Sequence, residues 1–440
     1  MLVPLVMSSY PVTYSSCGVS HTLTQTPTSV VTMTQGTTEI LLAMGLADKM
    51  VGTAYLDDAI WPRYKAEYDS IPVLASSYPT EAQIMDTSSG RTRGIFNESL
   101  GNVTCDGAGS EFADSSYNTC RPQLNAMGIG TWLDPTACED KTLRPQGGAT
   151  AETVYAAVRT IGNIFNVDAV AEQLVSEMKN DFRIADNTVR AAHGGTPLKA
   201  IWLDCIGCCR DENGDRTNEQ LFIGAGSGAP NLVMQESGLT NAFADIDASW
   251  ECVKISDIVA ADADVMIIVD AAWDPAITKI DFMHNHSSFC DAGFVQRADY
   301  ITIPFSASTL GPRNGAAALD MASAAIHVTT GQVMPNFESG VSFFDADVLI
   351  NRTAKMLCPI DTNSVAYASG RTAAANPDPP DASPPWALII VVIVLGVLFA
   401  AIFLFACFMY RREKAGTPIF YNLKETPGSK TVKSETGSAA

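Results

Sequence analysis

The chain has 440 residues, about three times a typical domain of ~150 residues, so two or three folded units are expected. Apolar residues make up 47% of the chain and charged residues 17%, which supports a sizeable core and argues against a disordered or coiled-coil protein. The net charge of −20 excludes a general nucleic-acid binder, because no basic excess exists to neutralise phosphates.

Two interpretations stay open for the N-terminal segment, residues 1–16. Its first part, Met1–Met7, is apolar but short and lacks the basic residues that begin a secretory signal peptide. Either this weak segment serves as the signal, or the sequence starts within a longer one. We predict no regular structure for residues 1–16.

Residues 17–148 alternate short apolar strands with helical stretches, which predicts a parallel sheet covered on both faces. The expected strands are Val30–Met33, Met50–Ala54, Ile71–Ala75, Arg93–Phe96 and Ile129–Leu133, and the expected helical stretches are Thr37–Met44 and Thr80–Thr87. Residues 99–119 are rich in Gly, Ser and Asn and indicate a surface insertion.

Residues 149–195 predict a helical spine between two lobes. One apolar series is spaced by four, three and four residues and a second by four throughout, which is the period of an amphipathic helix. The two series are Val154, Val158, Ile161 and Phe165, and Val170, Leu174, Met178 and Phe182. We expect a break between them near Asn166.

Strand–helix alternation resumes over residues 196–360. The expected strands are Lys199–Leu203, Leu221–Gly224, Val265–Asp270 and Tyr300–Ile303, and the expected helices are Pro230–Ser237, Asp257–Ala261 and Arg313–His327. Residues 328–360 are predicted to be irregular. Residues 361–385 are predicted to be a Pro-rich stalk.

Trp386–Tyr410 is an apolar stretch of 25 residues without a charge. As a helix with a rise of ~1.5 Å per residue it would be ~37 Å long, enough to cross a hydrocarbon core of ~30 Å. Arg411 and Arg412 follow it directly, and the preceding side has no nearby Lys. By the positive-inside rule we expect residues 411–440 to be a cytoplasmic tail.

The expected localisation is therefore the plasma membrane or an endomembrane, with a single span and the N-terminal part extracellular or lumenal. Ten cysteines precede the span, which suggests disulfides in an oxidising compartment, although their pairing is open. The cluster Cys205–Cys209 favours disulfides over a metal clip, because no further ligand follows at zinc spacing. Four sequons predict N-glycosylation at Asn97, Asn102, Asn285 and Asn351.

The sequence of residues 27–55, PTSVVTMTQGTTEILLAMGLADKMVGTAY, resembles the opening of class III substrate-binding proteins of ABC importers, which bind ferric siderophores, haem or cobalamin. The likeness continues in the family's order through Glu152–Val167, Gly224–Gly238, Asn241–Asp245, Ser249–Asp270 and Pro304–Asn314. Residues 90–120 and 204–218 depart from the family pattern. With a C-terminal span, the chain resembles membrane-anchored siderophore-binding proteins of eukaryotic algae such as diatoms.

The resemblance implies two Rossmann-like α/β lobes bridged by the helical spine, with the ligand held in the cleft between them. Open α/β sheets bind ligands beyond the carboxyl ends of their strands. Aromatic and basic side chains at or near such ends are the candidate ligand-binding residues: Tyr55, Trp61, Tyr78, Arg93, Phe96, Trp132, Trp202, Trp250, Trp273, Phe305 and Arg313. An aromatic after a strand is also common as core, so both interpretations stay open for each residue.

Three further features have two interpretations. His284 and His286 could bind a metal, but a solvated loop is favoured. The segment Gly224–Gly228 lacks the Gly-Lys-Ser/Thr of a phosphate loop, so it indicates a strand-to-helix turn whose backbone N–H groups could face a ligand. Arg313 could bind ligand or pair on its own helix.

The expected function is a cell-surface receptor that binds a ferric siderophore for iron uptake. The alternatives are haem or cobalamin as the ligand, an archaeal anchored importer component, and an adhesion or scaffolding ectodomain with an empty cleft. No hydrolase elbow, metalloprotease or Walker A motif is present, so we expect no enzyme and no cofactor. Besides the chelate and the membrane, the expected partner is a membrane transporter, a reductase or endocytic machinery, and not nucleic acid.

Overall fold

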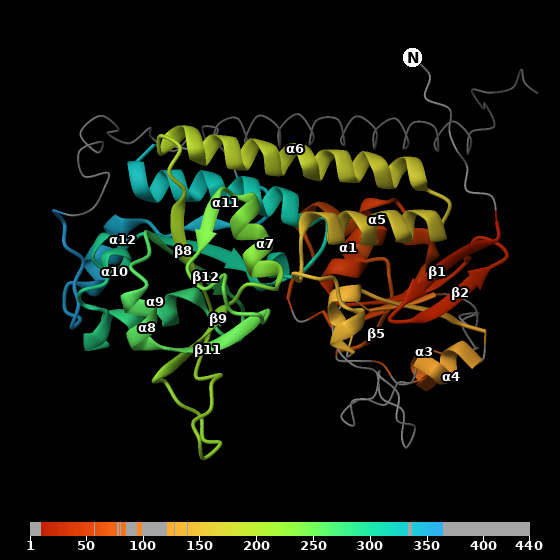
Figure 1. Cartoon of the computed structure of the whole chain (residues 1–440), viewed down its shortest axis with the longest axis horizontal. Coiled ribbons are helices and arrows are strands. Elements are labelled where there is room, and N and C mark those ends of the chain that lie inside the picture. Colours follow the sequence, from red (N-terminus) through yellow and green to blue (C-terminus); the bar gives the residue numbers. More distant parts are fainter. Residues whose placement is uncertain are drawn as a thin grey trace, which may run out of the picture. The chain divides into compact units, whose positions relative to one another are not determined.

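The computed structural model describes residues 10–56, 58–76, 79, 81–84, 95–98, 121–126, 128–138, 140–332 and 337–363. All of them belong to one compact unit. Figure 1 shows two α/β lobes with two helices running beside them. Within these ranges no helix is long and apolar enough to cross a membrane, and the expected span Trp386–Tyr410 lies outside them.

The first lobe is built on a five-stranded sheet in the order β5-β4-β3-β6-β7, in which every pairing is parallel. Its strands are β3 (Val30–Met33), β4 (Met50–Ala54), β5 (Val73–Ala75), β6 (Ile95–Glu98) and β7 (Gly130–Leu133). Its α-helices are α1 (Gln35–Ala43), α2 (Lys65–Tyr68), α3 (Glu81–Ile84) and α4 (Arg121–Ala126). The predicted parallel sheet is confirmed for this lobe, with all four residues of the central β3 buried.

Residues 12–23 form a hairpin, so the prediction that residues 1–16 lack regular structure is wrong for its last part. Strand β1 (Val12–Ser16) pairs with β2 (Val19–Leu23) across a two-residue turn. Both turn residues, Cys17 and Gly18, have positive φ, as a tight primed turn requires. Alternate residues of β1 are buried, and this period of two was present in the sequence.

The spine is two helices, α5 (Ala151–Ile164) and α6 (Asp168–Ala192), and the predicted break is confirmed. Thr150 and Thr153 form a reciprocal capping box that begins α5. Asn166 lies between the helices with a φ of 56°, a left-handed conformation that ends the first helix. The buried faces of both helices join one core cluster with apolar residues of both lobes.

The second lobe has a seven-stranded mixed sheet in the order β11-β9-β8-β12-β13-β14, with β10 also paired to β8. Its strands are β8 (Leu198–Ile206), β9 (Gln220–Gly224), β10 (Leu239–Asn241), β11 (Trp250–Lys254), β12 (Val265–Asp270), β13 (Tyr300–Pro304) and β14 (Ser342–Phe343). Its α-helices are α7 (Ala229–Glu236), α8 (Ile255–Ala260), α9 (Ala276–His284), α10 (Gly293–Arg297), α11 (Arg313–Thr330) and α12 (Ala346–Thr353).

Two expectations for this lobe are corrected. The sheet is not wholly parallel, because β9 runs antiparallel to β8 and to β11. A parallel pair needs a crossover connection, usually helical, and no helix lies between β8 and β9. Residues 328–360 are not wholly irregular, since they contain β14 and α12, whose N-cap Asp345 accepts a hydrogen bond from the Asp347 N–H.

Four disulfides confirm the expected oxidised state of the described cysteines. The pairs are Cys17–Cys138, Cys205–Cys208, Cys209–Cys252 and Cys290–Cys358. The cluster at Cys205 is thus used in two disulfides, as favoured over a metal clip. Cys105 and Cys120 lie outside the described residues.

Candidate functional site

The two lobes touch through backbone contacts at the start of the spine. The Ala149 N–H of the first lobe donates to the Ser227 carbonyl of the second at 2.8 Å. Gly148 has a φ of +77°, and a Cβ there would lie 2.3 Å from the same carbonyl oxygen. Only glycine allows this approach, so the contact sets the distance between the turn before α5 and the turn before α7.

A buried ion pair joins the lobes at a second point. The Arg313 guanidinium donates to both Glu39 carboxylate oxygens, with Nε 3.1 Å from Oε2. Its Nη1 also donates to the Ser306 Oγ at 2.6 Å, and the Trp61 N–H donates to Glu39 Oε1 at 2.7 Å. Arg313 is 3% exposed and its charge is already paired. The expectation that Arg313 offers a cation to the cleft is therefore corrected: this side chain fastens the lobes together.

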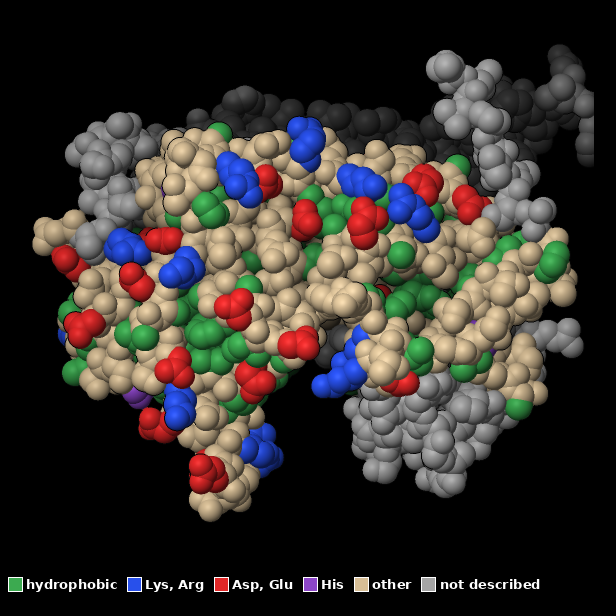
Figure 2. Space-filling model, viewed as in Figure 1, with side chains coloured by type: hydrophobic (Ala, Val, Ile, Leu, Met, Phe, Trp, Pro, Cys, Tyr) green, Lys and Arg blue, Asp and Glu red, His purple; other side chains and the backbone are tan. Residues whose placement is uncertain are grey.

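Beside the contact of Gly148 with Ser227 lies a cavity of about 740 Å³ between the lobes, here named the interlobe cavity. Figure 2 shows the hollow between the lobes, with basic side chains on one side of it. The lining combines one loop of the first lobe with the β9–α7 and β11 region of the second: Thr136, Lys141, Thr142, Arg144, Pro145, Gln146, Gly147, Gly148, Phe222, Ser227, Asp247, Ala248, Ser249 and Trp250.

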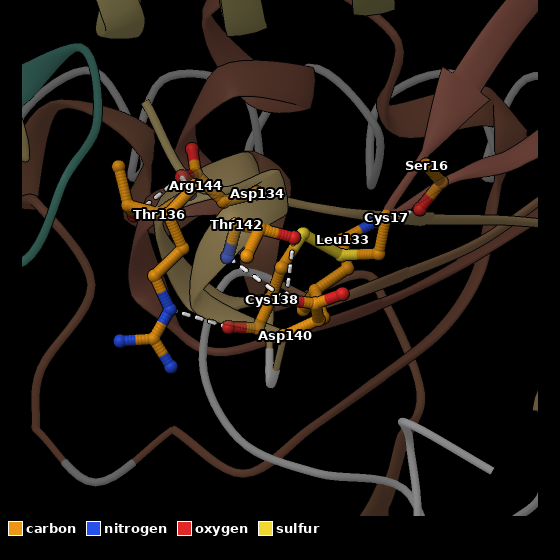
Figure 3. The surroundings of a disulfide bond; sticks show 9 residues. All are labelled: Ser16, Cys17, Leu133, Asp134, Thr136, Cys138, Asp140, Thr142 and Arg144. Atoms are coloured by element: carbon orange, nitrogen blue, oxygen red, sulfur yellow. Dashed lines mark hydrogen bonds between the residues drawn. A yellow bond between two sulfur atoms is a disulfide. The ribbon is translucent and has the colours of Figure 1, made fainter. Parts of the chain in front are cut away.

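Arg144 is the basic side chain that the loop orients into this cavity. Its Nε donates to the Cys138 carbonyl, and Cys138 is bound to Cys17 of the N-terminal hairpin (Figure 3). Figure 3 shows the two terminal nitrogens of Arg144 pointing away from the disulfide. The loop is further held by Asp140, whose carboxylate accepts from the Thr142 N–H at 2.8 Å. Arg144 therefore presents a fork of donors on an anchored loop.

The opposite wall carries Trp250, one of the predicted ligand-binding residues. It begins strand β11 and pairs there with Gly224, the last residue of β9. Its indole Nε1 is buried and has no hydrogen-bond acceptor among the described residues. Nearby, the Ser227 Oγ donates to Asp247 Oδ1 at 2.8 Å, which orients both side chains. The second-lobe wall of the cavity thus combines the Trp250 side chain with the Ser227–Asp247 pair.

The turn after β9 does not present free backbone donors to this cavity. The N–H groups of Ala225, Gly226 and Ser227 donate to carbonyls of residues 246–249 within the same lobe, at 2.9–3.0 Å. A Cβ at Gly226 would lie 2.0 Å from the Ala244 carbonyl oxygen, so this glycine permits close backbone packing. The expectation that these amides could face a ligand is corrected.

The remaining predicted aromatic residues are scattered. Trp132 and Trp202 are 2% and 0% exposed within the core, which favours the core interpretation for both. Tyr55 packs against the apolar cluster at the edge of the first sheet. Trp273 and Phe305 form an edge-to-face pair, with centroids 5.8 Å apart, at the carboxyl ends of β12 and β13. Trp273 is 56% exposed and so available for contact.

Several other predictions can be placed only in part. Trp61 is buried and lines a different cavity. Tyr78, Arg93 and the Phe96 side chain lie outside the described residues. For the sequons, the Asn285 and Asn351 side chains are exposed, while the Asn97 side chain and Asn102 also lie outside.

His284 is buried, so the solvated-loop interpretation is wrong for this residue. Its Nε2 is 3.0 Å from the Tyr300 hydroxyl, and its Nδ1 bonds to the Cys358 carbonyl. Burial lowers the pKa of His284, which keeps it neutral. The described residues contain no group of three His, Cys, Asp or Glu side chains that could hold a metal ion.

A buried charge cluster lies at the carboxyl ends of β8 and β12. Lys279 is fully buried and donates to the Val269 and Asp274 carbonyls, at 2.6 and 3.0 Å, and also pairs with the Asp274 carboxylate. Asp204 is 6% exposed, and its Oδ1 has no hydrogen-bond partner among the described residues. Burial raises the pKa of Asp204 to about 6, although Lys279 opposes the shift.

Sequence reasoning missed Lys141 and Arg144. Both lie in a stretch without a strand or helix pattern, and their approach to the second lobe depends on the Cys17–Cys138 bond. The available signal was local: Arg144-Pro145 followed by Gly147-Gly148 directly before a capped helix. Such a glycine pair indicates that two backbone segments pack closely. A basic residue beside the pair is then a candidate for the interface between the lobes.

Comparison with known proteins identifies the fold. No family model matches the chain, and no curated protein matches its sequence. A periplasmic binding protein from Veillonella parvula matches with a TM-score of 0.56 and 20% identity, over 71% of this chain and 96% of that one. An ABC-type Fe3+-hydroxamate transport system structure from Saccharomonospora viridis matches with a TM-score of 0.53 and 20% identity, over 72% and 98%.

A periplasmic heme binding protein from Pseudomonas aeruginosa matches with a TM-score of 0.52 and 13% identity, over 72% of this chain and 98% of that one. At these identities the likeness concerns the fold and does not extend to the ligand. The chain has the α/β fold of periplasmic binding proteins, which confirms the lobe-and-spine architecture expected from the sequence.

Proposed function

We propose that the chain is a receptor that binds an iron(III) chelate of the ferric-siderophore type in the interlobe cavity. The observation that carries the proposal is the anchored Arg144, which together with Trp250 lines a cavity between two lobes of the periplasmic-binding-protein fold. Binding proteins of this architecture hold ligands where the lobes meet, and pockets at such interfaces are common ligand sites.

The chemistry of the lining supports an anionic, oxygen-rich ligand. Lys141 and Arg144 are cations, the Thr136 and Thr142 hydroxyls are polar, and Trp250 and Phe222 add aromatic surface. Asp247 is the one carboxylate in the described lining. Chelates with hydroxamate, catecholate or carboxylate arms present oxygen acceptors, which guanidinium and ammonium donors bind well.

The lining favours a preformed chelate over haem. Haem iron takes His, Tyr, Cys or Met as its protein ligand. None of these residue types is among the described residues that line the interlobe cavity. A chelate whose iron is already saturated by its own oxygens needs no such ligand, and only its outer surface is recognised.

We further propose that the receptor works at a membrane surface. Trp386–Tyr410 would be the anchor, with residues 1–385 outside the cytoplasm and the sequons glycosylated. The bound chelate would pass to a membrane transporter or reductase, or enter by endocytosis. The apolar stretch and its basic flank support the anchor.

The test is titration of the purified full-length chain with a ferric hydroxamate, haem and cobalamin, with the iron-free hydroxamate as a control. Tryptophan fluorescence, corrected for absorption by coloured ligands, and the shift in melting temperature would report binding. We expect saturable binding of the ferric hydroxamate and not of its iron-free form. Selective binding of haem or cobalamin would replace the chelate in the proposal, and no binding by the folded chain would favour a scaffold.

Arg144→Gln is the variant that links this binding to the interlobe cavity. Loss of a charge-assisted hydrogen bond, worth about 1.5–3 kcal/mol, should weaken chelate binding about 10–100-fold. Arg183→Gln is the matched control, because Arg183 is exposed on α6 and, among the described residues, its side chain bonds only to Asn180 on the same helix. Equal affinity of the two variants would contradict the assignment of the site.

A further inference from the structure

A second cavity, of about 530 Å³, lies against the spine and shares no lining residue with the interlobe cavity. We name it the spine cavity. It is enclosed by the segment after β4, by α6 and by the start of α11: Ala43, Trp61, Arg63, Tyr64, Val170, Gln173, Leu174, Glu177, Met178, Asp181, Pro312, Ala316, Leu319 and Glu338. Nothing in the proposed function uses this cavity.

The aromatic wall of the spine cavity is held in place before any ligand binds. The Trp61 indole Nε1 donates to the Glu338 carbonyl at 2.8 Å, and the Trp61 N–H is bound to Glu39. The Tyr64 ring meets the Trp61 ring edge to face, with centroids 5.6 Å apart. Leu174, Met178 and Leu319 add an aliphatic floor. Together they form a rigid apolar surface.

The charges around this apolar surface are unbalanced. Three carboxylates line the cavity, those of Glu177, Asp181 and Glu338, against one cation, Arg63. Asp181 is half-buried, and the described residues offer its carboxylate no hydrogen bond or ion pair. Burial raises the pKa of Asp181, the nearby Glu177 and Glu338 raise it further, and Arg63 opposes them without reversing the shift. A cation placed here would relieve both effects.

The Trp61 ring already accepts a cation. The Arg63 guanidinium carbon lies 4.6 Å from the Trp61 ring centroid, within the range of a cation–π contact. Arg63 is exposed, so its charge is shared with solvent and leaves the carboxylates in excess. The site therefore combines an aromatic face, an aliphatic floor and surplus negative charge.

We propose that the spine cavity binds an aliphatic ammonium ligand, such as an alkyl diamine. The alkyl chain lies on Leu174, Met178 and Leu319, and an ammonium group donates to Asp181 and Glu177. This arrangement suits an amphipathic cation, which buries its alkyl chain on apolar side chains and pairs its ammonium group with carboxylates. The cavity, about 530 Å³, has room for a ligand of this size.

The test is calorimetric titration of the full-length chain with cadaverine, which carries two ammonium groups on five carbons. Hexanoate and 1,5-pentanediol are the anionic and neutral controls of similar length. We expect one cadaverine site, no hexanoate binding, and pentanediol binding weaker by about tenfold or more. Quenching of Trp61 fluorescence should accompany the binding of cadaverine.

Asp181→Asn should weaken cadaverine binding about tenfold, since it removes one charge-assisted partner. Asp186→Asn is the matched control: it lies on the same helix, pairs with Arg190 and does not line the spine cavity. Unchanged melting temperatures would establish that both variants fold. Absence of cadaverine binding, equal binding of pentanediol, or equal affinity of the two variants would overturn the proposal. Arg144→Gln should leave cadaverine binding unchanged, which separates this test from that of the chelate.

Discussion

The second lobe buries the carboxyl group of Asp204, where its charged form is unfavourable. Its side chain is buried, its Oδ1 is without a partner among the described residues, and Lys279 is the nearby cation that favours its charged form. The effect of burial is larger than that of Lys279, so the pKa of Asp204 is raised to about 6. The folded protein therefore binds this proton more tightly than the unfolded chain does.

The sign of the resulting pH dependence follows directly. The contribution of Asp204 to stability is fully present below about pH 4, the unfolded pKa, and is lost as the pH rises through about 6. The Asn side chain of Asp204→Asn cannot ionise. Relative to wild type, the free energy of unfolding of this variant should therefore rise by about 2–3 kcal/mol between pH 4 and pH 7.5. Urea unfolding of both proteins at the two pH values measures this difference. A difference that is independent of pH would contradict the assigned pKa shift.

Arg313 and Arg144 show where sequence reasoning stops at the residue scale. Arg313 was correctly placed at the start of the last long helix, but its partner Glu39 is 274 residues away. Arg144 depends on a disulfide that spans 121 residues. Side-chain roles set by such distant partners have no local signature in the sequence.

The two spine helices depend on one residue that interrupts them. Asn166 adopts a left-handed conformation, which costs most residues about 1 kcal/mol or more but is tolerated by Asn and Gly. Its side-chain Oδ1 is also buried without a hydrogen-bond partner among the described residues. The break lets α5 and α6 lie side by side, and their contact includes Gly162 against Ala171.

Substitutions at Asn166 should follow the backbone conformation and not helix propensity. Asn166→Gly should be neutral or stabilising, whereas Asn166→Ala should cost about 1 kcal/mol. Asn187, exposed within α6, is the control, where Ala should instead be more stable than Gly by about 1 kcal/mol. Chemical denaturation of the four variants measures the relative stability of the Gly and Ala variants at each position. If Ala is more stable than Gly at both positions, the left-handed backbone does not determine the effect of substitutions at Asn166.

Secondary structure was predictable where one period dominated. The continuous apolar runs Val30–Met33 and Val265–Asp270 are strands with the expected bounds, and the spine periodicity gave both helices. Trp250–Lys254 was missed because an edge strand buries only part of one face. The hairpin at Val12–Leu23 was missed because packing against distant residues and a disulfide stabilise it. Neither leaves a signal in the local sequence pattern.

At the scale of the whole molecule, the lobes are joined by few but strong contacts. The Glu39–Arg313 pair lies between α1 of the first lobe and α11 of the second, and the Ser306 N–H donates to Asp58 nearby at 2.7 Å. The likeness to periplasmic binding proteins gives the lobes-and-spine plan. These contacts therefore fix α1 and the segment after β4 of the first lobe against the start of α11 and the residues before it in the second.

The ion pair predicts a specific pattern of stabilities. Arg313→Met leaves the Glu39 charge buried without its partner, which should cost about 3–5 kcal/mol of unfolding free energy. Adding Glu39→Leu removes that charge and should recover most of the loss, because a buried pair is often replaced at little cost by apolar residues. The double variant should stay about 1–2 kcal/mol below wild type, since the Trp61 N–H then lacks its acceptor. Urea unfolding of the two variants tests this: a double variant that is no more stable than Arg313→Met would contradict the view that the pair acts as a unit that joins the lobes.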